Sequence, residues 1–387
     1  MKKIGTLLAL LFLSGCSVTE KQVANRETQT DQLKTYLTAH QASPEDYIIR
    51  KFQDHDVILL GEIHRIRHDP LLVQKLIPVL KEVGIFTLAT EFARHEDQVL
   101  IDSLLSGDVY DEQLARQITF QQHMSWAYQE YVDIFKAAWT VNKSSSTDTR
   151  QFKILGLNCS PDWSFIKTST DREVDSLKRL VWGGCGERDW AEVILEQVEL
   201  GEKVLVYCGM HHAFSGYLQP IVNDSGGFVR FEEDRLGRHI FEAIGKKRVM
   251  TVFLHSPWYG AGGYSDTLVR PCDGMIDDVM ALFGKTFQPV GFDVSGTPFG
   301  ELAPRNTVYC AGYNNLTLTD YCDGYIYQEP FDQSQAVTLI EDFINEGNLI
   351  QARQQCPNPY YRDASAEEFV AASRRTLDWW WQTLQKI

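Results

Sequence analysis

Residues 56–64, with the sequence DVILLGEIH, decide the fold. Val57 to Leu60 form a short apolar run, which is typical of a strand buried on both faces in a parallel sheet covered by helices. Gly61 then lets the backbone turn sharply. The strand therefore delivers a carboxylate, Glu62, and an imidazole, His64, together at its end.

The sequence after this strand predicts a helix and then a second strand. Asp69 and Pro70 are an N-cap followed by proline at the first helical position, and apolar residues repeat at helical spacing until Gly84. Residues 85–91 (IFTLATE) then predict a strand that ends in a glutamate. The three elements form a βαβ unit, whose strands run parallel with a right-handed crossover.

The strand ends bring ionisable side chains to one edge of the sheet. Parallel strands end on the same edge, where open α/β folds bind ligands, so we expect Glu62, His64 and Glu91 to share one crevice. The strand predicted at 203–208 (KVLVYC) is followed by GMHH, which ends at His212. A glycine therefore again precedes imidazoles at the end of a strand.

Apolar runs of strand length recur along the chain, separated mostly by helical patterns. We expect a three-layer α/β/α fold with a central, mainly parallel sheet, extra helical segments and a helical C-terminal portion. Trp379, Trp380 and Trp381 lie on three sides of the last helix, so part of this cluster should pack on the domain and part should face outward. The other predicted strands are 152–158, 248–255 and, more weakly, 288–294 and 324–328; the other predicted helical segments are 31–40, 94–105, 111–118, 124–141 and 334–387.

The chain begins with a pattern typical of a bacterial lipoprotein. A basic start precedes an apolar run at 7–13 that is too short to span a membrane as a permanent helix. The sequence LSGC then predicts cleavage before Cys16, which would anchor the protein in the membrane through a lipid. Because the next residue is serine rather than aspartate, we expect the outer membrane and its periplasmic face. Residues 16–30 should be a polar tether, and residues 31–387 should form the α/β domain.

Composition limits the class of protein. The chain has 387 residues, of which 44% are hydrophobic and 23% charged, as in ordinary globular proteins. Its net charge of −15 gives no basic footprint for nucleic acid. With Cys16 taken by lipid, an odd number of cysteines remains, and the absence of any CxxC pair argues against a structural zinc finger. Two disulfides are plausible, one between Cys159 and Cys185 and one between Cys310 and Cys322.

The residues at the strand ends support two kinds of chemistry. His64, Glu91 and His212 are a ligand set for zinc, manganese or cobalt that leaves one position for water. Glu62 can then act as general base on the metal-bound water. In the metal-free alternative, a His–Glu pair activates water or a substrate hydroxyl directly. The spacings do not choose between the two.

The order of these motifs resembles a known superfamily. GEIH at 61–64, Glu91 within ATEF and GMHH at 209–212 are similar to the pattern of the erythromycin esterase, ChaN and Tiki/TraB superfamily. Its members share a three-layer α/β fold with a first GxxH, a glutamate at a strand end and a later GxxH. The resemblance covers residues 50–260. His211 departs from it, because Tiki-like proteins have a small residue there, and the long C-terminal extension is also not theirs.

The resemblance implies a different activity for each branch. Tiki-like members are metal-dependent peptidases, which would place His64, Glu91 and His212 on the metal. Erythromycin esterase-like members hydrolyse a macrolide lactone without a metal, which would make His64, Glu62 and Glu91 catalytic. ChaN-like members are outer-membrane lipoproteins that bind haem, and the LSGC motif at Cys16 agrees with that branch.

The haem alternative has its own candidate ligands. Tyr207, His211 and His212 can serve as axial ligands, although no CxxCH motif is present. Two glutamates beside the histidines disfavour an apolar haem pocket. We therefore expect a cell-envelope hydrolase for a small-molecule or peptide substrate, with a haem-binding iron-uptake lipoprotein as the alternative. A scaffold that retains the fold without chemistry is a third interpretation.

Overall fold

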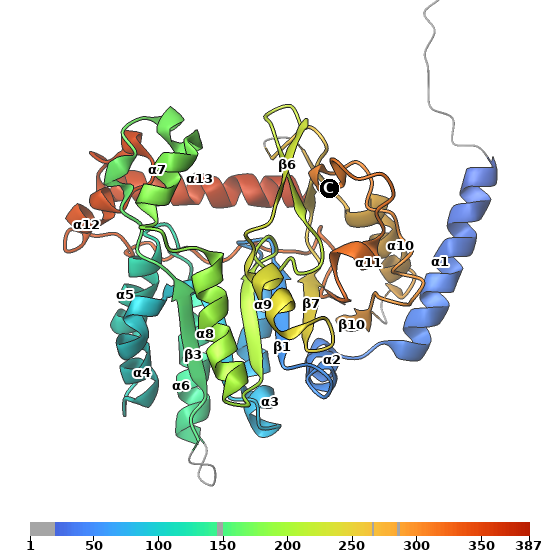
Figure 1. Ribbon diagram of the computed structural model, residues 1–387, viewed down its shortest axis with the longest axis horizontal. Helices are drawn as coiled ribbons and strands as arrows, with labels where there is room; N and C mark the ends of the chain where they lie inside the picture. The colour runs from blue at the N-terminus through green and yellow to red at the C-terminus, as the bar shows by residue number, and fades with distance from the viewer. Residues whose placement is uncertain (1–19, 145–149, 265–266, 285–286) are drawn as a thin grey trace, which may run out of the picture.

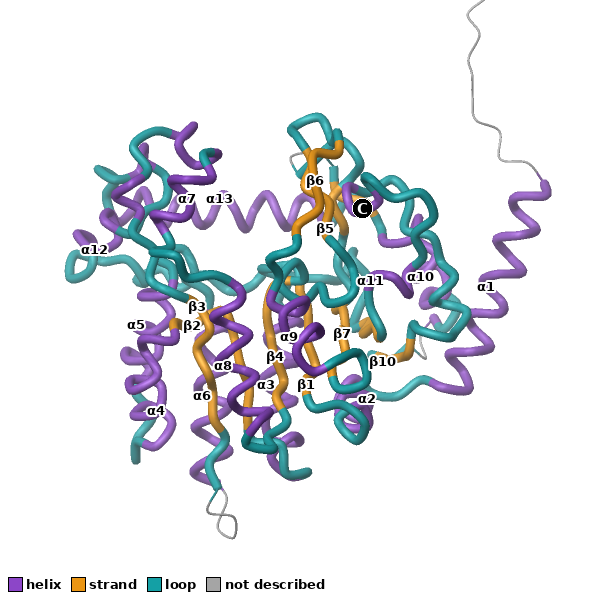
Figure 2. Tube along the Cα trace, in the orientation of Figure 1, coloured by secondary structure: helices purple, strands orange, loops and turns teal. Residues whose placement is uncertain are grey.

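The computed structural model describes residues 20–144, 150–264, 267–284 and 287–387 (Figures 1 and 2). The predicted signal peptide and the lipidation site Cys16 lie outside these residues. A seven-stranded sheet in the order β10-β11-β7-β1-β4-β2-β3 forms the centre, and all its neighbouring pairs are parallel except β10 with β11. Its strands are β1 (Val57–Glu62), β2 (Thr87–Arg94), β3 (Lys153–Asn158), β4 (Val204–Gly209), β7 (Val249–Leu254), β10 (Val290–Asp293) and β11 (Gly324–Tyr327).

Strand β1 occupies the middle of the sheet, as its apolar run predicts. It pairs with β4 on one side and β7 on the other, and every residue in it is buried. Its side chains alternate between the two faces: Ile58 and Leu60 belong to one hydrophobic core, and Val57 and Leu59 belong to the other. Two separate cores require a helical layer on each face.

Helices cover both faces of the sheet, so the predicted three-layer α/β/α fold is confirmed (Figure 1). The first layer contains α2 (Pro44–Lys51), α3 (His68–Glu82), α4 (Gln98–Ser106), α5 (Glu112–Gln122) and α6 (Gln129–Ser144), and the opposite layer contains α1 (Glu20–His40), α8 (Glu187–Glu199), α9 (Leu236–Ile244) and α10 (Met275–Ala281). The remaining elements are helices α7 (Asp175–Val181), α11 (Leu318–Tyr321), α12 (Leu349–Gln354) and α13 (Ala366–Leu384), and two hairpins formed by β5 (Gln219–Val222) with β6 (Phe228–Glu232) and β8 (Trp258–Tyr259) with β9 (Leu268–Val269). Within the described part of the chain, no helix combines the length and apolar character needed to cross a bilayer.

The C-terminal portion lies over the carboxyl edge of the sheet. Helix α13 crosses this edge at the top of the view in Figure 1. Trp380 is buried, whereas Trp379 and Trp381 are 50% and 42% exposed, which agrees with the predicted division of the cluster. The sequence predicts a mostly helical C-terminal portion over 334–387, but its beginning is extended, because the backbone there pairs with residues Ile66 and Tyr128.

Three other boundaries differ from the predictions. Helix α1 already begins at Glu20, so the second half of the expected tether is helical. Strand β2 continues past Glu91 to Arg94 through an irregularity in its register with β3, so Glu91 is not the last residue of its strand. Helix α6 begins at Gln129 rather than at residue 124, because the carbonyl of Ala127 accepts a hydrogen bond from the C-terminal segment, at the amide of Ile340.

Of the two proposed disulfides, only one forms. Cys159 and Cys185 are bonded, which confirms that prediction. Cys310 and Cys322 are free thiols, so the second pairing is wrong. Their sulfur atoms contact different backbone carbonyls, those of Pro304 and Leu318, and therefore do not meet.

Candidate functional site

The end of β1 holds a tightly bonded carboxylate beside a histidine. Glu62 is only 1% exposed, and its Oε1 accepts hydrogen bonds from the Tyr131 hydroxyl at 2.6 Å and from His64 Nδ1 at 2.7 Å. The Tyr207 hydroxyl donates to Oε2. In the tautomer that carries its proton on Nδ1, His64 donates this hydrogen bond to Glu62 and keeps Nε2 free to accept another.

Glu91 connects the ends of β2 and β4. Its Oε1 accepts the backbone N–H of Gly209 and lies 3.8 Å from His64 Nε2, and its Oε2 lies 3.3 Å from His212 Nε2. Gly209 makes this approach possible: a Cβ there would lie 2.8 Å from His64 Cε1 and 3.2 Å from Glu91 Oε1. Position 209 therefore requires glycine because a side chain there would collide with His64, and not because of its backbone angles.

His212 lies between two carboxylates. Glu91 faces its Nε2, and Glu187 Oε2 lies 3.0 Å from its Nδ1, as an ion pair without the alignment of a good hydrogen bond. Burial alone would lower the pKa of His212, but Glu187 and Glu91 outweigh it and raise the pKa to about 10. His212 is therefore an imidazolium at neutral pH.

The two carboxylates respond in the opposite direction. Burial opposes the ionisation of Glu91, yet His212, His64 and the Gly209 N–H lower its pKa to about 2. Burial likewise opposes ionisation of Glu187, yet His212, Arg235 and the Leu236 N–H lower its pKa to about 2. Both groups are therefore ionised at neutral pH.

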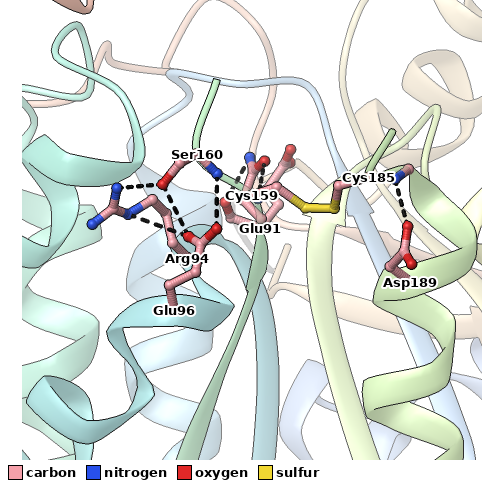
Figure 3. Close-up of a disulfide and its surroundings, with 9 residues drawn as sticks. Glu91, Arg94, Glu96, Cys159, Ser160, Cys185 and Asp189 are labelled. Carbon is pink, nitrogen blue, oxygen red and sulfur yellow. Dashed lines mark hydrogen bonds and ion pairs between the residues drawn. A yellow bond between two sulfur atoms is a disulfide. The ribbon is translucent and has the colours of Figure 1, made fainter. Parts of the chain in front are cut away.

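A disulfide supports the position of Glu187. Cys185 immediately precedes Gly186, the N-cap of α8, and Glu187 is the first residue of that helix. The disulfide to Cys159 ties this helix start to the end of β3, close to Glu91 (Figure 3). Arg235 Nη1 then donates to Glu187 Oε1 at 2.6 Å, which fixes the carboxylate from its other side.

A small cavity lies beside these groups, at the carboxyl ends of β1 and β4. Its volume is about 120 Å³, enough for about four water molecules at roughly 30 Å³ each. Trp380 of α13 forms part of its wall, so the C-terminal helix limits its size. The lining residues are Glu62, Ile63, His64, Arg65, Gly209, Met210, His211, His212, Tyr259 and Trp380.

The predicted metal ligands come together but do not fit a metal. His64, Glu91 and His212 meet at one edge, as the strand ends predict. However, carboxylates already face both ring nitrogens of His212, and its charged form has no lone pair to donate. Among the described residues, no group of three His, Cys, Asp or Glu side chains is arranged to hold a metal ion. The metal-bound version of the site is therefore not supported.

The candidate haem ligands do not face a haem-sized space. Tyr207 is fully buried and its hydroxyl is bonded to Glu62, while His211 Nε2 is 2.8 Å from the Tyr309 hydroxyl. Burial and the nearby charge of Arg235 lower the pKa of His211, so it is neutral. The adjoining cavity of about 120 Å³ is well below the roughly 300 Å³ at which pockets for drug-sized ligands begin. The cavity alone is therefore too small to enclose a haem.

Sequence reasoning missed three contributors to the site. Glu187 follows an irregular glycine-rich stretch, Tyr131 comes from the aromatic face of α6, and Trp380 comes from the far end of the chain. A signal existed for Glu187, because a bridge between Cys159 and Cys185 brings the start of α8 to the strand ends. The aromatic pattern of α6 did not distinguish a site residue from ordinary core.

Comparison with known proteins supports the motif analysis. Residues 48–165 match the family model described as haem-binding uptake, Tiki superfamily, ChaN. The predicted superfamily resemblance is therefore confirmed over these residues. The ChaN/Tiki match contains Glu62, His64 and Glu91 but ends before His211 and His212. A search of curated proteins found no significant match.

Solved structures with the same type of fold are distant in sequence. A succinoglycan biosynthesis protein is 10% identical with a TM-score of 0.50, and the alignment covers 79% of this chain and 97% of that chain. An erythromycin esterase EreC mutant in its open conformation is 10% identical with a TM-score of 0.48, covering 76% and 95%. ChaN of Campylobacter jejuni, described with cofacial haem binding, is 18% identical with a TM-score of 0.38, covering 56% and 87%. These similarities concern the fold, and the family match over residues 48–165 does not choose between haem binding and hydrolysis.

Proposed function

We propose that this chain is a hydrolase that activates water with His64. The observation that carries the proposal is the 2.7 Å hydrogen bond between His64 Nδ1 and Glu62, which leaves Nε2 without a hydrogen bond, 3.8 Å from Glu91, in a residue that lines the cavity. A histidine oriented by a buried carboxylate is a standard arrangement for a general base. Tyr131 and Tyr207 keep the carboxylate in place by donating to it.

The roles of the remaining residues follow from their charges. His64 Nε2 takes a proton from water as the water attacks a carbonyl carbon, and it returns that proton to the leaving group. Glu62 positions the imidazole and balances its charge while it holds the proton. His212 is a fixed positive charge close to His64, and such charges stabilise the negative charge that develops during acyl transfer. Glu91 and Glu187 keep His212 charged and in place.

A substitution at His64 tests this proposal. His64→Gln should lower kcat/KM for ester or peptide hydrolysis by about 100-fold or more, the usual contribution of a general base. His95 is exposed and outside the cavity, so His95→Gln is the matched control and should retain the wild-type rate. A panel of fluorogenic esters and peptides provides the assay. Equal rates in wild type and His64→Gln would refute the role of His64.

The alternative function is haem binding for iron uptake, and the description of the matched family favours it. Adding haem to the purified protein separates the two functions. If a Soret band survives gel filtration and no substrate is hydrolysed, the protein is a haem carrier rather than a hydrolase, and its haem site lies outside the cavity. Hydrolysis without a retained Soret band would support the proposed function.

We also propose that the chain is anchored in the outer membrane through a lipid on Cys16. The support is the signal sequence and the LSGC motif that precede the described residues. Labelled palmitate should enter the wild-type protein and not Cys16→Ser. Labelling of both proteins, or of neither, would contradict the anchor.

A further inference from the structure

Arg65 lies on the cavity wall and has no carboxylate partner among the described residues. Its Nε donates to the Tyr128 hydroxyl at 3.0 Å, and its guanidinium carbon lies 5.2 Å from the ring centre of Trp126. Within the described part of the chain, Nη1 and Nη2 have no hydrogen-bond partner. Aromatic faces therefore hold the guanidinium in place while leaving its paired N–H groups available.

The backbone of Arg65 is held in an unfavourable conformation. Its φ is 78°, in the left-handed region that side chains other than glycine rarely adopt. The Arg65 N–H donates to the Tyr131 hydroxyl, which in turn donates to Glu62, and the Arg65 carbonyl accepts from Val337. Strain of this kind persists only where the surroundings impose it, and it is concentrated at functional sites. Here it is imposed on a residue that lines the same cavity as His64.

Tyr259 supplies a second donor to the same cavity. Its hydroxyl has no hydrogen-bond partner among the described residues, although its ring is largely covered. Burial raises the pKa of Tyr259, and the positive charge of Arg65 opposes that rise, which indicates that the two groups lie close together. His123 also lies close to Arg65, and burial and that charge lower its pKa to about 4. His123 is therefore neutral at pH 7 and adds no second positive charge beside Arg65.

Arg65 differs from the other positive groups of the site in having no carboxylate beside it. His212 lies between Glu91 and Glu187, and Arg235 is also paired with Glu187. The positive charges of His212 and Arg235 are therefore directed at carboxylates of the protein. The charge of Arg65 remains available to an anion that enters the cavity.

We propose that Arg65 and Tyr259 bind a carboxylate of the substrate beside the bond that His64 hydrolyses. A guanidinium fork matches the two oxygens of a carboxylate, and a phenol can donate to either oxygen. A group of this size is compatible with a cavity of about 120 Å³. The inference rests on the proposed hydrolase function and gives it a substrate class, which is esters or amides with a free carboxylate near the scissile bond.

Two esters of matched shape test the proposal with the full chain. Monoaryl fumarate has a free carboxylate, aryl fumaramate has a neutral amide in its place, and the trans double bond prevents attack of one group on the other. The wild type should hydrolyse the carboxylate ester with kcat/KM at least about tenfold higher than the amide ester. In Arg65→Gln, this preference should fall to about one, mainly through KM, and Tyr259→Phe should reduce it partially.

Two comparisons separate recognition from structural damage. Gln keeps a side chain of similar size on the left-handed backbone, so the strain at position 65 is unchanged. A merely structural role would lower the rates for both esters alike and leave their ratio intact, which would overturn the proposal. Arg50 is exposed on α2, away from the cavity, and Arg50→Gln should keep the wild-type ratio. No preference in the wild type would also overturn the proposal.

A binding measurement keeps this inference distinct from the hydrolase function. If the wild type hydrolyses neither ester, the proposed function fails. Calorimetric titration with monomethyl fumarate then tests whether the carboxylate site exists. Binding that is at least tenfold weaker in Arg65→Gln would support the carboxylate site. Absence of binding to the wild type, or equal binding to both proteins, would refute it.

Discussion

Glu187→Gln should change the charge state of His212 without altering the shape of the site. Glutamine keeps the size of the side chain, but it removes the negative charge that lies 3.0 Å from His212 Nδ1. At that distance and an effective dielectric constant of about 20, two unit charges attract by about 5.5 kcal/mol, or about four pKa units. The 24% exposure of His212 weakens this attraction through solvent screening. We therefore expect the pKa to fall from about 10 to about 6–8.

The dependence of stability on pH should change accordingly. A histidine whose pKa is raised on folding stabilises the fold fully below its unfolded pKa of about 6.5, and loses this contribution as pH rises through the folded value. In the wild type that loss should extend up to about pH 10. In Glu187→Gln it should be largely complete by about pH 8, and the variant should be destabilised at pH 7 by about 3–5 kcal/mol, as when one partner of a buried ion pair is removed.

Titration of imidazole resonances by NMR, with histidine labelled in the ring, measures the pKa directly. His212→Gln identifies the resonance by its disappearance, and urea unfolding at several pH values measures stability. Glu192→Gln lies on the exposed side of the same helix and should behave as wild type. If His212 titrates near 6.5 in the wild type, or still near 10 in Glu187→Gln, the assignment of its charge to the two carboxylates is refuted.

Two further changes test the positioning of the site. Gly209→Ala places a methyl group 3.0 Å from His64 Nε2. It should lower the free energy of unfolding measured in urea by about 1–3 kcal/mol and should slow hydrolysis. Gly216→Ala is the control and should change neither, because a Cβ at position 216 would have nothing within 4 Å. Cys159→Ser removes the disulfide that closes a loop spanning 26 residues, so the free energy of unfolding should fall by about 3 kcal/mol. Treatment of the wild type with a reductant should have the same effect. An unchanged denaturation midpoint in both cases would contradict a stabilising disulfide.

The central strand and half of the site were predictable because local sequence determines them. An uninterrupted apolar run specifies a doubly buried strand, and parallel pairing then forces the groups after it to the same edge, which places Glu62, His64, Glu91 and His212 together. Their division of roles was not predictable. It depends on which nitrogen of each ring meets a carboxylate, and that is decided by side-chain geometry rather than by spacing.

The remainder of the site depends on contacts distant in sequence. Glu187 reaches His212 through the start of α8, and Trp380 reaches the cavity from α13. Arg65 adopts its left-handed conformation under the influence of Tyr131 and the C-terminal segment, neither of which a local pattern around residue 65 contains. Tertiary contacts of this kind override local preference, and for that reason sequence reasoning gave the wrong boundaries for the aromatic helix and the C-terminal portion.

The two histidines differ in what they can do because their partners differ. His64 is hydrogen-bonded to a carboxylate at Nδ1, but at Nε2 Glu91 stays 3.8 Å away, so Nε2 can exchange a proton with a molecule bound in the adjoining cavity. His212 has carboxylates at both nitrogens, so it holds its proton and contributes charge. The disulfide between Cys159 and Cys185 stabilises this difference, because it fixes the helix start that carries Glu187. If that helix start moved away, His212 would lose one of its two carboxylates and resemble His64. The disulfide therefore does more than close a loop: it helps to keep the general base and the fixed cation chemically distinct.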